Sequence, residues 1–132
     1  LGALDAMRGC LEQGDVLVFP LDQHAWPPDG VEVDFFGAPA WTSKSLAIIA
    51  LATGAPVLPV VAWREAGGRH VLRFEEALPL IECENMDEAI RRNMLAHNQA
   101  LERLVLRHPE QWNWVQRRWK HAASRQPPRA QC

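Results

Sequence analysis

The sequence is poor in cysteine and lacks the short motifs that mark metal or nucleophile chemistry. Its three cysteines, Cys10, Cys83 and Cys132, are far apart and form no C-x-x-C pair, which argues against a disulfide framework and a zinc site. There is also no Gly-x-Ser-x-Gly elbow, no glycine-rich phosphate loop and no His-Glu-x-x-His. We therefore expect a reducing compartment, and we predict no metal and no cofactor.

The chain also lacks a strong excess of either charge. It has 132 residues, 14 basic against 16 acidic, for a net charge of −2, which argues against a protein that coats nucleic acid. With 48% hydrophobic residues, its composition is that of one globular domain. No signal-type segment opens the chain, and its first residue is Leu1. We expect a processed start or a part of a longer protein.

The two ends of the chain carry opposite charge. Residues 1–37 hold seven acidic side chains and only Arg8 as a base. Residues 107–129 hold six basic side chains and one acid, interleaved with Trp112, Trp114 and Trp119. A basic segment rich in tryptophan suits an anionic interface.

The first third of the chain predicts a helix, a strand and a long loop. Apolar residues at three- and four-residue spacing predict a helix over 2–13, ended by Gly14. The valine-rich run Asp15 to Phe19 predicts a short buried strand. Prolines and glycines then punctuate a long connection from Pro20 to Trp41. Loops of this length are often functional.

The middle of the chain predicts a parallel sheet. A helix is expected through Lys44 to Thr53, capped by Thr42 or Ser43 and ended by Gly54. Pro56 to Trp63 has the composition of a buried strand. The uncharged run from Leu46 to Trp63 is long enough to suggest a membrane span, but its glycine and prolines divide it into helix and strand. The stretch from His70 to Leu78 predicts an antiparallel edge strand.

The last third predicts a pair of helices. Asn85 and Glu88 have the spacing of a capping box at the start of a long helix. That helix places Ile90, Met94, Leu101, Leu104 and Val105 on one face, and Arg91, Arg92, Asn93, Glu102 and Arg103 on the other. Pro109 predicts a second short helix to Lys120. We expect residues 124–132 to be disordered.

The pair His24 and Asp29 is one candidate for catalysis. A histidine held by a carboxylate can act as a general base on a hydroxyl, and the spacing is that of the His-x-x-x-x-Asp signature of glycerolipid acyltransferases. However, Pro27 and Pro28 lie between the two residues, where the signature needs a strand-to-helix turn. A chance coincidence is therefore the favoured interpretation.

Two other candidates lie near the predicted strand. Asp22 and Gln23 follow that strand directly, where open α/β sheets bind ligands; a carboxylate and an amide suit hydrogen bonds to sugar hydroxyls. The alternative is a turn starter that satisfies local backbone donors. Phe35 and Phe36 either cover a pocket or pack in the core, and core packing is favoured for at least one of them.

The segment from His108 to Lys120 has three open interpretations. Its tryptophans and basic residues suit a membrane surface. The same residue types bind nucleic acid through phosphate contacts and stacking. In a purely structural interpretation, the tryptophans pack onto the sheet while the arginines stay in solvent.

The order of these segments resembles that of the bacterial lipid A biosynthesis acyltransferases, a family of the lysophospholipid acyltransferase superfamily. The similarity covers nearly the whole chain and matches the C-terminal half of that family. It rests on four motifs in family order: Pro20-Leu21-Asp22-Gln23, Phe35-Phe36-Gly37, Thr53-Gly54-Ala55-Pro56-Val57-Leu58-Pro59-Val60, and the block from His108-Pro109-Glu110-Gln111-Trp112 through Arg117-Arg118-Trp119-Lys120.

The resemblance implies a fold and an activity. The fold class is α/β, a partial acyltransferase-like sheet with flanking helices and a C-terminal helical pair, with residues 1–123 as part of one domain. The activity is transfer of a fatty acyl group from acyl carrier protein to a hydroxyl of a lipid A precursor or related glycolipid, at the cytoplasmic face of a bacterial inner membrane. The family's His-x-x-x-x-Asp/Glu pair precedes the Asp-Gln element and is absent here, so we expect the isolated chain to be inactive.

The resemblance also assigns roles to matched residues. Asp22, Gln23 and His24 correspond to an acceptor-binding loop, and Pro56, Pro59 and Val60 to a block lining the acyl side. The surface facing anionic lipid would comprise Trp112, Trp114, Arg117, Arg118 and Lys120. Glu32 and Asp34 depart from the family pattern, as do His24 and Trp26, which suggests a different lipid acceptor. The alternative function is a non-catalytic lipid-binding module that uses the C-terminal segment.

Overall fold

The computed structural model describes residues 2–120, which form a mixed α/β structure. These residues contain three α-helices and two small antiparallel sheets of two strands each. The elements are α1 (Gly2–Glu12), β1 (Gly30–Phe35), β2 (Ala38–Ser43), α2 (Ser45–Thr53), β3 (Val60–Arg64), β4 (His70–Phe74) and α3 (Met86–Val105), with short 3-10 turns at Ala66–Gly68 and Pro109–Gln111. The predicted tail, residues 124–132, lies outside the described part of the chain.

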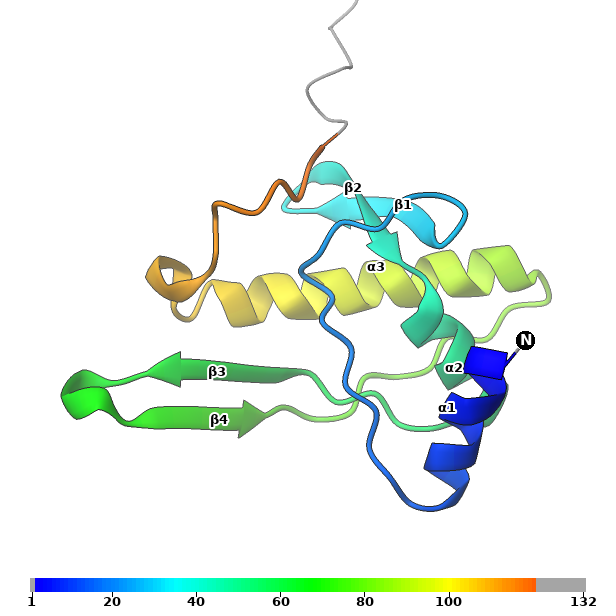
Figure 1. The fold of residues 1–132 in the computed structure, drawn as a ribbon. Coiled ribbons are helices and arrows are strands. Elements are labelled where there is room, and N and C mark those ends of the chain that lie inside the picture. The colour runs from blue at the N-terminus through cyan, green and yellow to red at the C-terminus, as the bar shows by residue number, and fades with distance from the viewer. Residues whose placement is uncertain (1, 121–132) are drawn as a thin grey trace, which may run out of the picture.

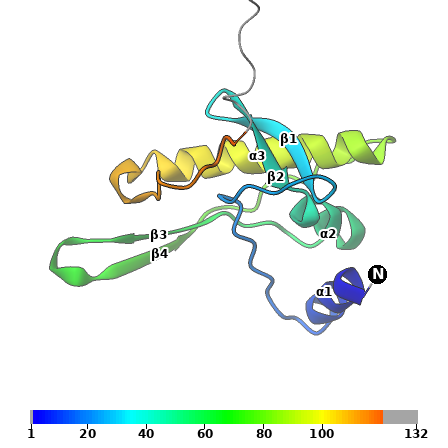
Figure 2. The same ribbon diagram turned by 45° about the horizontal axis from the view of Figure 1, so that its top comes forward.

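The helix α3 is the centre of the molecule. In both views the β1–β2 hairpin lies on one side of α3 and the β3–β4 hairpin on the other (Figures 1 and 2). The side chain of Asn85 accepts a hydrogen bond from the backbone N–H of Glu88 at 2.9 Å, so the predicted cap is confirmed. Ile90 and Met94 of α3 pack on Val33 of β1 and Ala47 of α2.

One residue predicted for the solvated face of α3 is buried instead. Asn93 is fully buried. Its side-chain oxygen accepts a hydrogen bond from the N–H of Ile81 at 3.0 Å, and its side-chain nitrogen donates to the carbonyl of Ile81 at 2.7 Å. An amide with both a donor and an acceptor can satisfy a backbone that runs beside it. Asn93 therefore fixes the segment that leads into α3.

The two glycine-ended helices follow their predictions. The helix α1 ends before Gly14 and α2 before Gly54, and both glycines have positive φ, at 84° and 68°. Only glycine adopts that conformation without a steric cost. The start of α2 differs in detail, because Lys44 is the N-cap and makes no side-chain cap, while the hydroxyl of Ser43 accepts from the N–H of Ser45.

The predicted loop from Pro20 to Trp41 contains a β-hairpin. β1 and β2 pair antiparallel from Gly30 opposite Ser43 to Phe35 opposite Ala38. Phe36 and Gly37 form the turn, with φ of 51° and 72°. The N–H of Phe36 donates to Glu102 of α3 at 2.6 Å, which helps to hold this unfavourable phenylalanine conformation. Phe35 is fully buried, so core packing of one of the two phenylalanines is confirmed.

The predicted parallel sheet is wrong for the described residues. Residues 15–19 are extended but belong to neither sheet, and the Pro56–Trp63 prediction is reduced to β3 and a bridge from Val57 to Leu78. β3 pairs with β4 as an antiparallel hairpin, so the antiparallel strand expected from His70 is confirmed. A parallel pair needs a second strand beside the first, and residues 2–120 place none beside 15–19.

The predicted second C-terminal helix is also wrong. After the single turn Pro109–Gln111, residues 112–120 are irregular. Their side chains bond the β1–β2 hairpin: the indole N–H of Trp119 donates to the carbonyl of Phe35 at 3.1 Å, and Arg118 donates to that of Trp41 at 2.6 Å. These contacts replace the hydrogen bonds of a helix. Within residues 2–120, no helix is long and apolar enough to cross a membrane.

Candidate functional site

The described residues form an open apolar groove of about 850 Å³. Its walls include residues 15–22, residues 55–62 and the face of α3 that carries His97, Leu101 and Leu104, with further apolar residues from α2 and β4. A site of this size with apolar walls and a few polar groups has the usual character of a small-molecule or lipid pocket. It is large enough for an aliphatic chain.

The first wall alternates like a strand although it is unpaired. Leu17 and Phe19 are partly covered, whereas Val16 and Val18 are 84% and 87% exposed. Covered and exposed side chains alternate along residues 15–19, as they do in a strand. The predicted burial of this segment is wrong, because Val16 and Val18 lie in solvent. Val16 and Val18 form a free apolar edge in the described structure.

The second wall contains the residues assigned to the acyl side. Pro56, Pro59 and Val60 all line the groove. The two prolines keep this stretch extended and remove two backbone N–H groups from an apolar surface. The structure thus brings these three residues to the same cavity as the first wall, while their role in binding stays a prediction.

Asp22 ends the first wall of the groove. Its carboxylate accepts a hydrogen bond from the side-chain amide of Gln116 at 3.0 Å, across 94 positions of sequence. Of the predicted loop Asp22-Gln23-His24, Asp22 is the residue that lines the groove; Gln23 is exposed. The acceptor-loop role of these residues remains a prediction, with Asp22 in the best place for it.

A buried cation stands behind Asp22. Arg118 is only 1% exposed, although its neighbour Arg117 is exposed. Its guanidinium donates to the carbonyl of Trp41 and to the hydroxyl of Thr42. Burial lowers the pKa of Arg118 from its ordinary value to about 10, and the charge of Asp22 opposes this shift. Arg118 therefore stays a cation at neutral pH.

Arg118 is thus not part of a membrane-facing surface, and that prediction is wrong for this residue. The cause is the turn structure of residues 112–120, which directs Arg118 and Trp119 toward the β1–β2 hairpin and leaves Arg117 in solvent. Asn98 of α3 joins the same network by donating to Thr42 at 3.3 Å and to the carbonyl of Asp34 at 3.0 Å. The sequence Arg-Arg offers no signal for which arginine turns inward.

The tryptophans divide between core and surface. Trp119 stacks on Phe35 with ring centroids 5.6 Å apart, and Trp112 lies 5.8 Å from the same ring. Trp114 is 52% exposed, and Lys120 is also exposed. The structural interpretation therefore applies to Trp112 and Trp119, while Trp114, Arg117 and Lys120 remain available for a surface.

His97 is a groove residue that the sequence analysis did not single out. It is 3% exposed, and burial lowers its pKa from 6.5 to about 4. Its Nδ1 atom makes no hydrogen bond to any described residue. The signal was its place in the helix, seven residues after Ile90 and four before Leu101, on the apolar face.

His24 and Asp29 lie at the entrance to the β1–β2 hairpin. The ring of His24 packs edge-on against Trp26 with centroids 4.6 Å apart. Asp29 is exposed, its N–H donates to the carbonyl of Trp26 at 3.0 Å, and its carbonyl accepts from Lys44. The turn contains a cis peptide between Pro27 and Pro28. A catalytic role for this pair stays a prediction.

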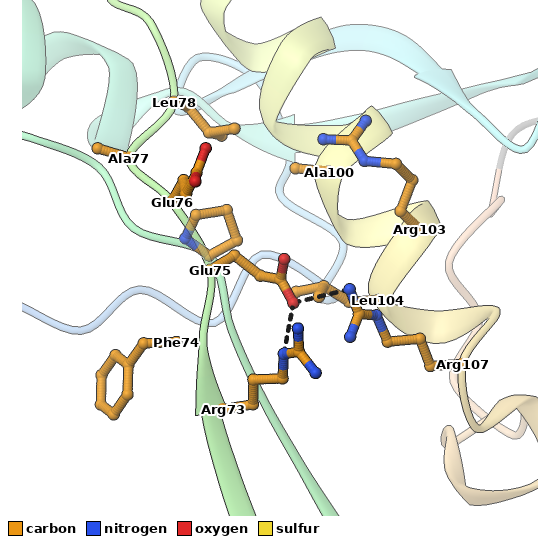
Figure 3. Close-up of a pocket in the computed structure, with 11 residues that line it drawn as sticks. Arg73, Phe74, Glu75, Glu76, Ala77, Leu78, Ala100, Arg103, Leu104 and Arg107 are labelled. Atoms are coloured by element: carbon orange, nitrogen blue, oxygen red, sulfur yellow. Dashed lines mark ion pairs between the residues drawn. The ribbon is translucent and has the colours of Figure 1, made fainter.

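A second, charged pocket lies between β4 and the end of α3 (Figure 3). Glu75 accepts ion pairs from Arg73 at 3.2 Å and from Arg107 at 2.9 Å. Because both arginines are partly in solvent, each pair stabilises the fold only modestly. The pair with Arg107 ties the end of the β3–β4 hairpin to the segment after α3, whereas the pair with Arg73 lies within the end of β4.

Comparison with known proteins identifies the family. Residues 2–121 match the family described as bacterial lipid A biosynthesis acyltransferase. The chain belongs to this family. The resemblance stated from its motifs is therefore confirmed, although the comparison does not test the fold of the family's enzymes.

Two curated relatives come from Mycobacterium tuberculosis, strains CDC 1551 / Oshkosh and ATCC 25618 / H37Rv. Each is named phosphatidylinositol mannoside acyltransferase and is 34% identical over 90 residues. That stretch is 68% of this chain and 27% of the relative. The chain thus spans about a quarter of the length of the curated relatives it matches. Family and relatives agree on acyl transfer in lipid metabolism.

Proposed function

We propose that this chain supplies the acyl groove and the acceptor contact of an enzyme that moves a fatty acyl group from a thioester to a hydroxyl of a glycolipid. The family match over residues 2–121 carries the proposal. The groove supports it, since its apolar walls suit an aliphatic chain and Asp22 supplies a hydrogen-bond acceptor for a hydroxyl where one wall ends.

The acceptor is proposed to be a glycolipid with a polyol or sugar head group. The two relatives are named for a phosphatidylinositol mannoside, and the family is described by lipid A biosynthesis, for which we propose a lipid A precursor as the acceptor. Both carry sugar hydroxyls and phosphate. The donor is proposed to be acyl carrier protein, with a coenzyme A thioester as the alternative that the assay distinguishes.

The catalytic base is proposed to come from residues outside this chain. The family resemblance places a His-x-x-x-x-Asp/Glu pair before the Asp-Gln element, and Asp29 lies exposed in the turn before β1. In the enzyme that contains this chain, His24→Ala should therefore lower acyl transfer far less than the loss of a general base would. A loss of several hundredfold, the size expected for a general base, would instead assign the base to His24.

The direct test is a transfer assay. The enzyme is incubated with palmitoyl thioester, carried by acyl carrier protein or by coenzyme A, and with either a phosphatidylinositol mannoside or a lipid A precursor. We expect an acylated glycolipid, and a loss of product with Asp22→Asn that is larger than with Asp29→Asn. Absence of product from every pair of donor and acceptor would contradict the proposal.

We also propose that the enzyme works at a membrane surface. Trp114 and Val115 are 52% and 91% exposed, and Arg117 and Lys120 are exposed beside them. Aromatic, aliphatic and basic side chains together suit an anionic lipid interface. Sedimentation with vesicles should show more binding to anionic than to neutral lipid, and less after Trp114→Ala. Equal binding to both vesicle types would contradict it.

A further inference from the structure

We propose that Gln116 and Arg118 are positioning residues that fix the carboxylate of Asp22 for contact with the acceptor. This inference rests on the proposed function. It assigns a task within the active enzyme to the C-terminal segment, for which the sequence analysis offered a lipid surface, nucleic-acid binding or structural packing. Neither residue touches the reacting atoms; each acts through Asp22.

The hydrogen bond from Gln116 orients one oxygen of the carboxylate. Its amide nitrogen lies 3.0 Å from Oδ2 of Asp22, and both side chains are half-buried. A bond to a charged group in such surroundings is stronger than a neutral one. The amide occupies Oδ2, which leaves the other oxygen, Oδ1, for a hydroxyl of the acceptor.

The backbone of Gln116 is itself held. Its N–H donates to Asn113 at 3.2 Å, and its carbonyl accepts from Arg118 at 2.9 Å. Arg118 in turn is anchored to β2 through Trp41 and Thr42. The side-chain amide is therefore presented from a fixed turn.

Arg118 contributes charge without forming the contact. Arg118 interacts electrostatically with Asp22, but its guanidinium donates its hydrogen bonds to β2. The Cζ atom of Arg118 lies over the ring of Phe35, 5.1 Å from the ring centroid. The contribution of Arg118 to positioning is the anchor that it gives to the turn: its N–H donates to the carbonyl of Gln116, and its guanidinium holds this turn to β2.

The test separates positioning from mere stability. Gln116→Leu should raise the KM for a phosphatidylinositol mannoside acceptor about tenfold, the factor expected for one lost bond to a charged group, while the KM for the palmitoyl thioester stays the same. The side chain in Gln116→Glu has the same shape but lacks the N–H donor, so this variant should raise the acceptor KM at least as much. Gln99→Leu, the same change at an exposed site of α3, is the matched control.

A double substitution checks that Gln116 acts through Asp22. In an Asp22→Asn enzyme, Gln116→Leu should raise the acceptor KM by less than twofold further, because interacting residues give non-additive effects. A full tenfold effect in that background would overturn the inference, as would equal changes in donor and acceptor KM in the single variant. If the unsubstituted enzyme transfers no acyl group, the proposed function itself is wrong.

The hydrogen bond can also be observed without activity. In the 132-residue chain, the side-chain amide signal of Gln116 in an ¹⁵N-resolved spectrum should shift on Asp22→Asn and stay unchanged on Asp29→Asn. If the Gln116 side-chain amide signal does not shift in Asp22→Asn, the inference is overturned even if the enzyme is active.

Discussion

At the scale of single residues, Arg118 is the clearest case of a side chain whose role depends on the fold. It is buried beside Asn98 and Thr42, and it satisfies the carbonyl of Trp41. Removing the guanidinium takes one charged donor from each of two acceptors, while the N–H of Ala25 still donates to Trp41 and the amide of Asn98 to Thr42. Its neighbour Arg117 has the same chemistry in solvent.

Arg118 and its exposed neighbour Arg117 provide a matched comparison of how much each arginine stabilises the fold. Arg118→Gln should lower the free energy of unfolding by about 2–4 kcal/mol, because the shorter amide cannot reach both acceptors. Arg117→Gln should change it by less than about 0.5 kcal/mol. Urea denaturation followed by circular dichroism measures both. Equal effects of the two substitutions would contradict the buried position of Arg118.

His97 makes stability depend on acidity. Its folded pKa of about 4 lies below the ordinary 6.5, so the unfolded chain takes up a proton between these values while the folded chain does not. Stability from this residue is therefore full above pH 6.5 and falls as the pH is lowered toward 4, by ~3 kcal/mol in total.

His97→Gln isolates this effect. The variant should lose less free energy of unfolding between pH 7 and pH 4 than the unsubstituted chain, by ~3 kcal/mol, because glutamine does not titrate. His70→Gln at the exposed start of β4 is the control. Parallel pH profiles for the His97 variant and the unsubstituted chain would show that His97 is not held neutral.

Residue-scale prediction from sequence worked where one local rule decides and failed where the path of the chain decides. The cap at Asn85 was predicted from local spacing alone, whereas the binding roles of Pro56, Pro59 and Asp22 come from the family resemblance and stay predictions. Arg117 and Arg118 could not be told apart, because the choice depends on an irregular turn. His97 was passed over because a lone histidine carries no spacing signal, although its buried place follows from the period of α3.

At the scale of elements, α1, α2 and α3 follow from their own sequence, whereas the helix predicted for Pro109 to Lys120 does not form and, of the strands, only β4 was predicted with its antiparallel pairing. Caps, glycine stops and apolar spacing lie within one segment, so α1, α2 and α3 could be predicted. A strand needs a partner elsewhere in the chain. The run 15–19 has strand alternation without a partner in the described residues, and the turn at Phe36 and Gly37 made a hairpin where a loop was expected.

The cap of α3 is testable as an element property. Asn85→Ala removes the bond to the N–H of Glu88 and should lower the free energy of unfolding by about 1 kcal/mol. Glu84→Ala, one residue earlier and exposed, should have no comparable effect. Thermal unfolding of the two variants compares them; a smaller loss for Asn85→Ala than for Glu84→Ala would exclude the cap.

At the scale of the whole molecule, the open groove leaves apolar surface uncovered. Four large apolar side chains that line the groove are at least 60% exposed: Val16, Val18, Leu72 and Phe74. Uncovered apolar edges favour association between chains. The isolated chain should therefore self-associate at high micromolar concentration.

Charge placed on that edge should reverse the association. Val16→Lys with Val18→Lys should move the sedimentation distribution toward monomer, since edge lysines oppose strand pairing. Leu106→Lys, at another exposed apolar position, should leave the distribution unchanged. A monomeric unsubstituted chain at all concentrations would contradict the idea that this edge is adhesive.

The central claim for the whole molecule is that the groove holds the acyl chain that the enzyme transfers. The most direct measurement is the ratio of palmitoyl to decanoyl transfer in the enzyme that contains this chain, before and after Leu17→Trp fills part of the groove. We expect Leu17→Trp to lower this ratio at least fivefold, because the added ring shortens the space for the longer acyl chain. Leu106→Trp should leave the ratio unchanged. A ratio that stays the same in the Leu17 variant would show that the acyl chain binds elsewhere.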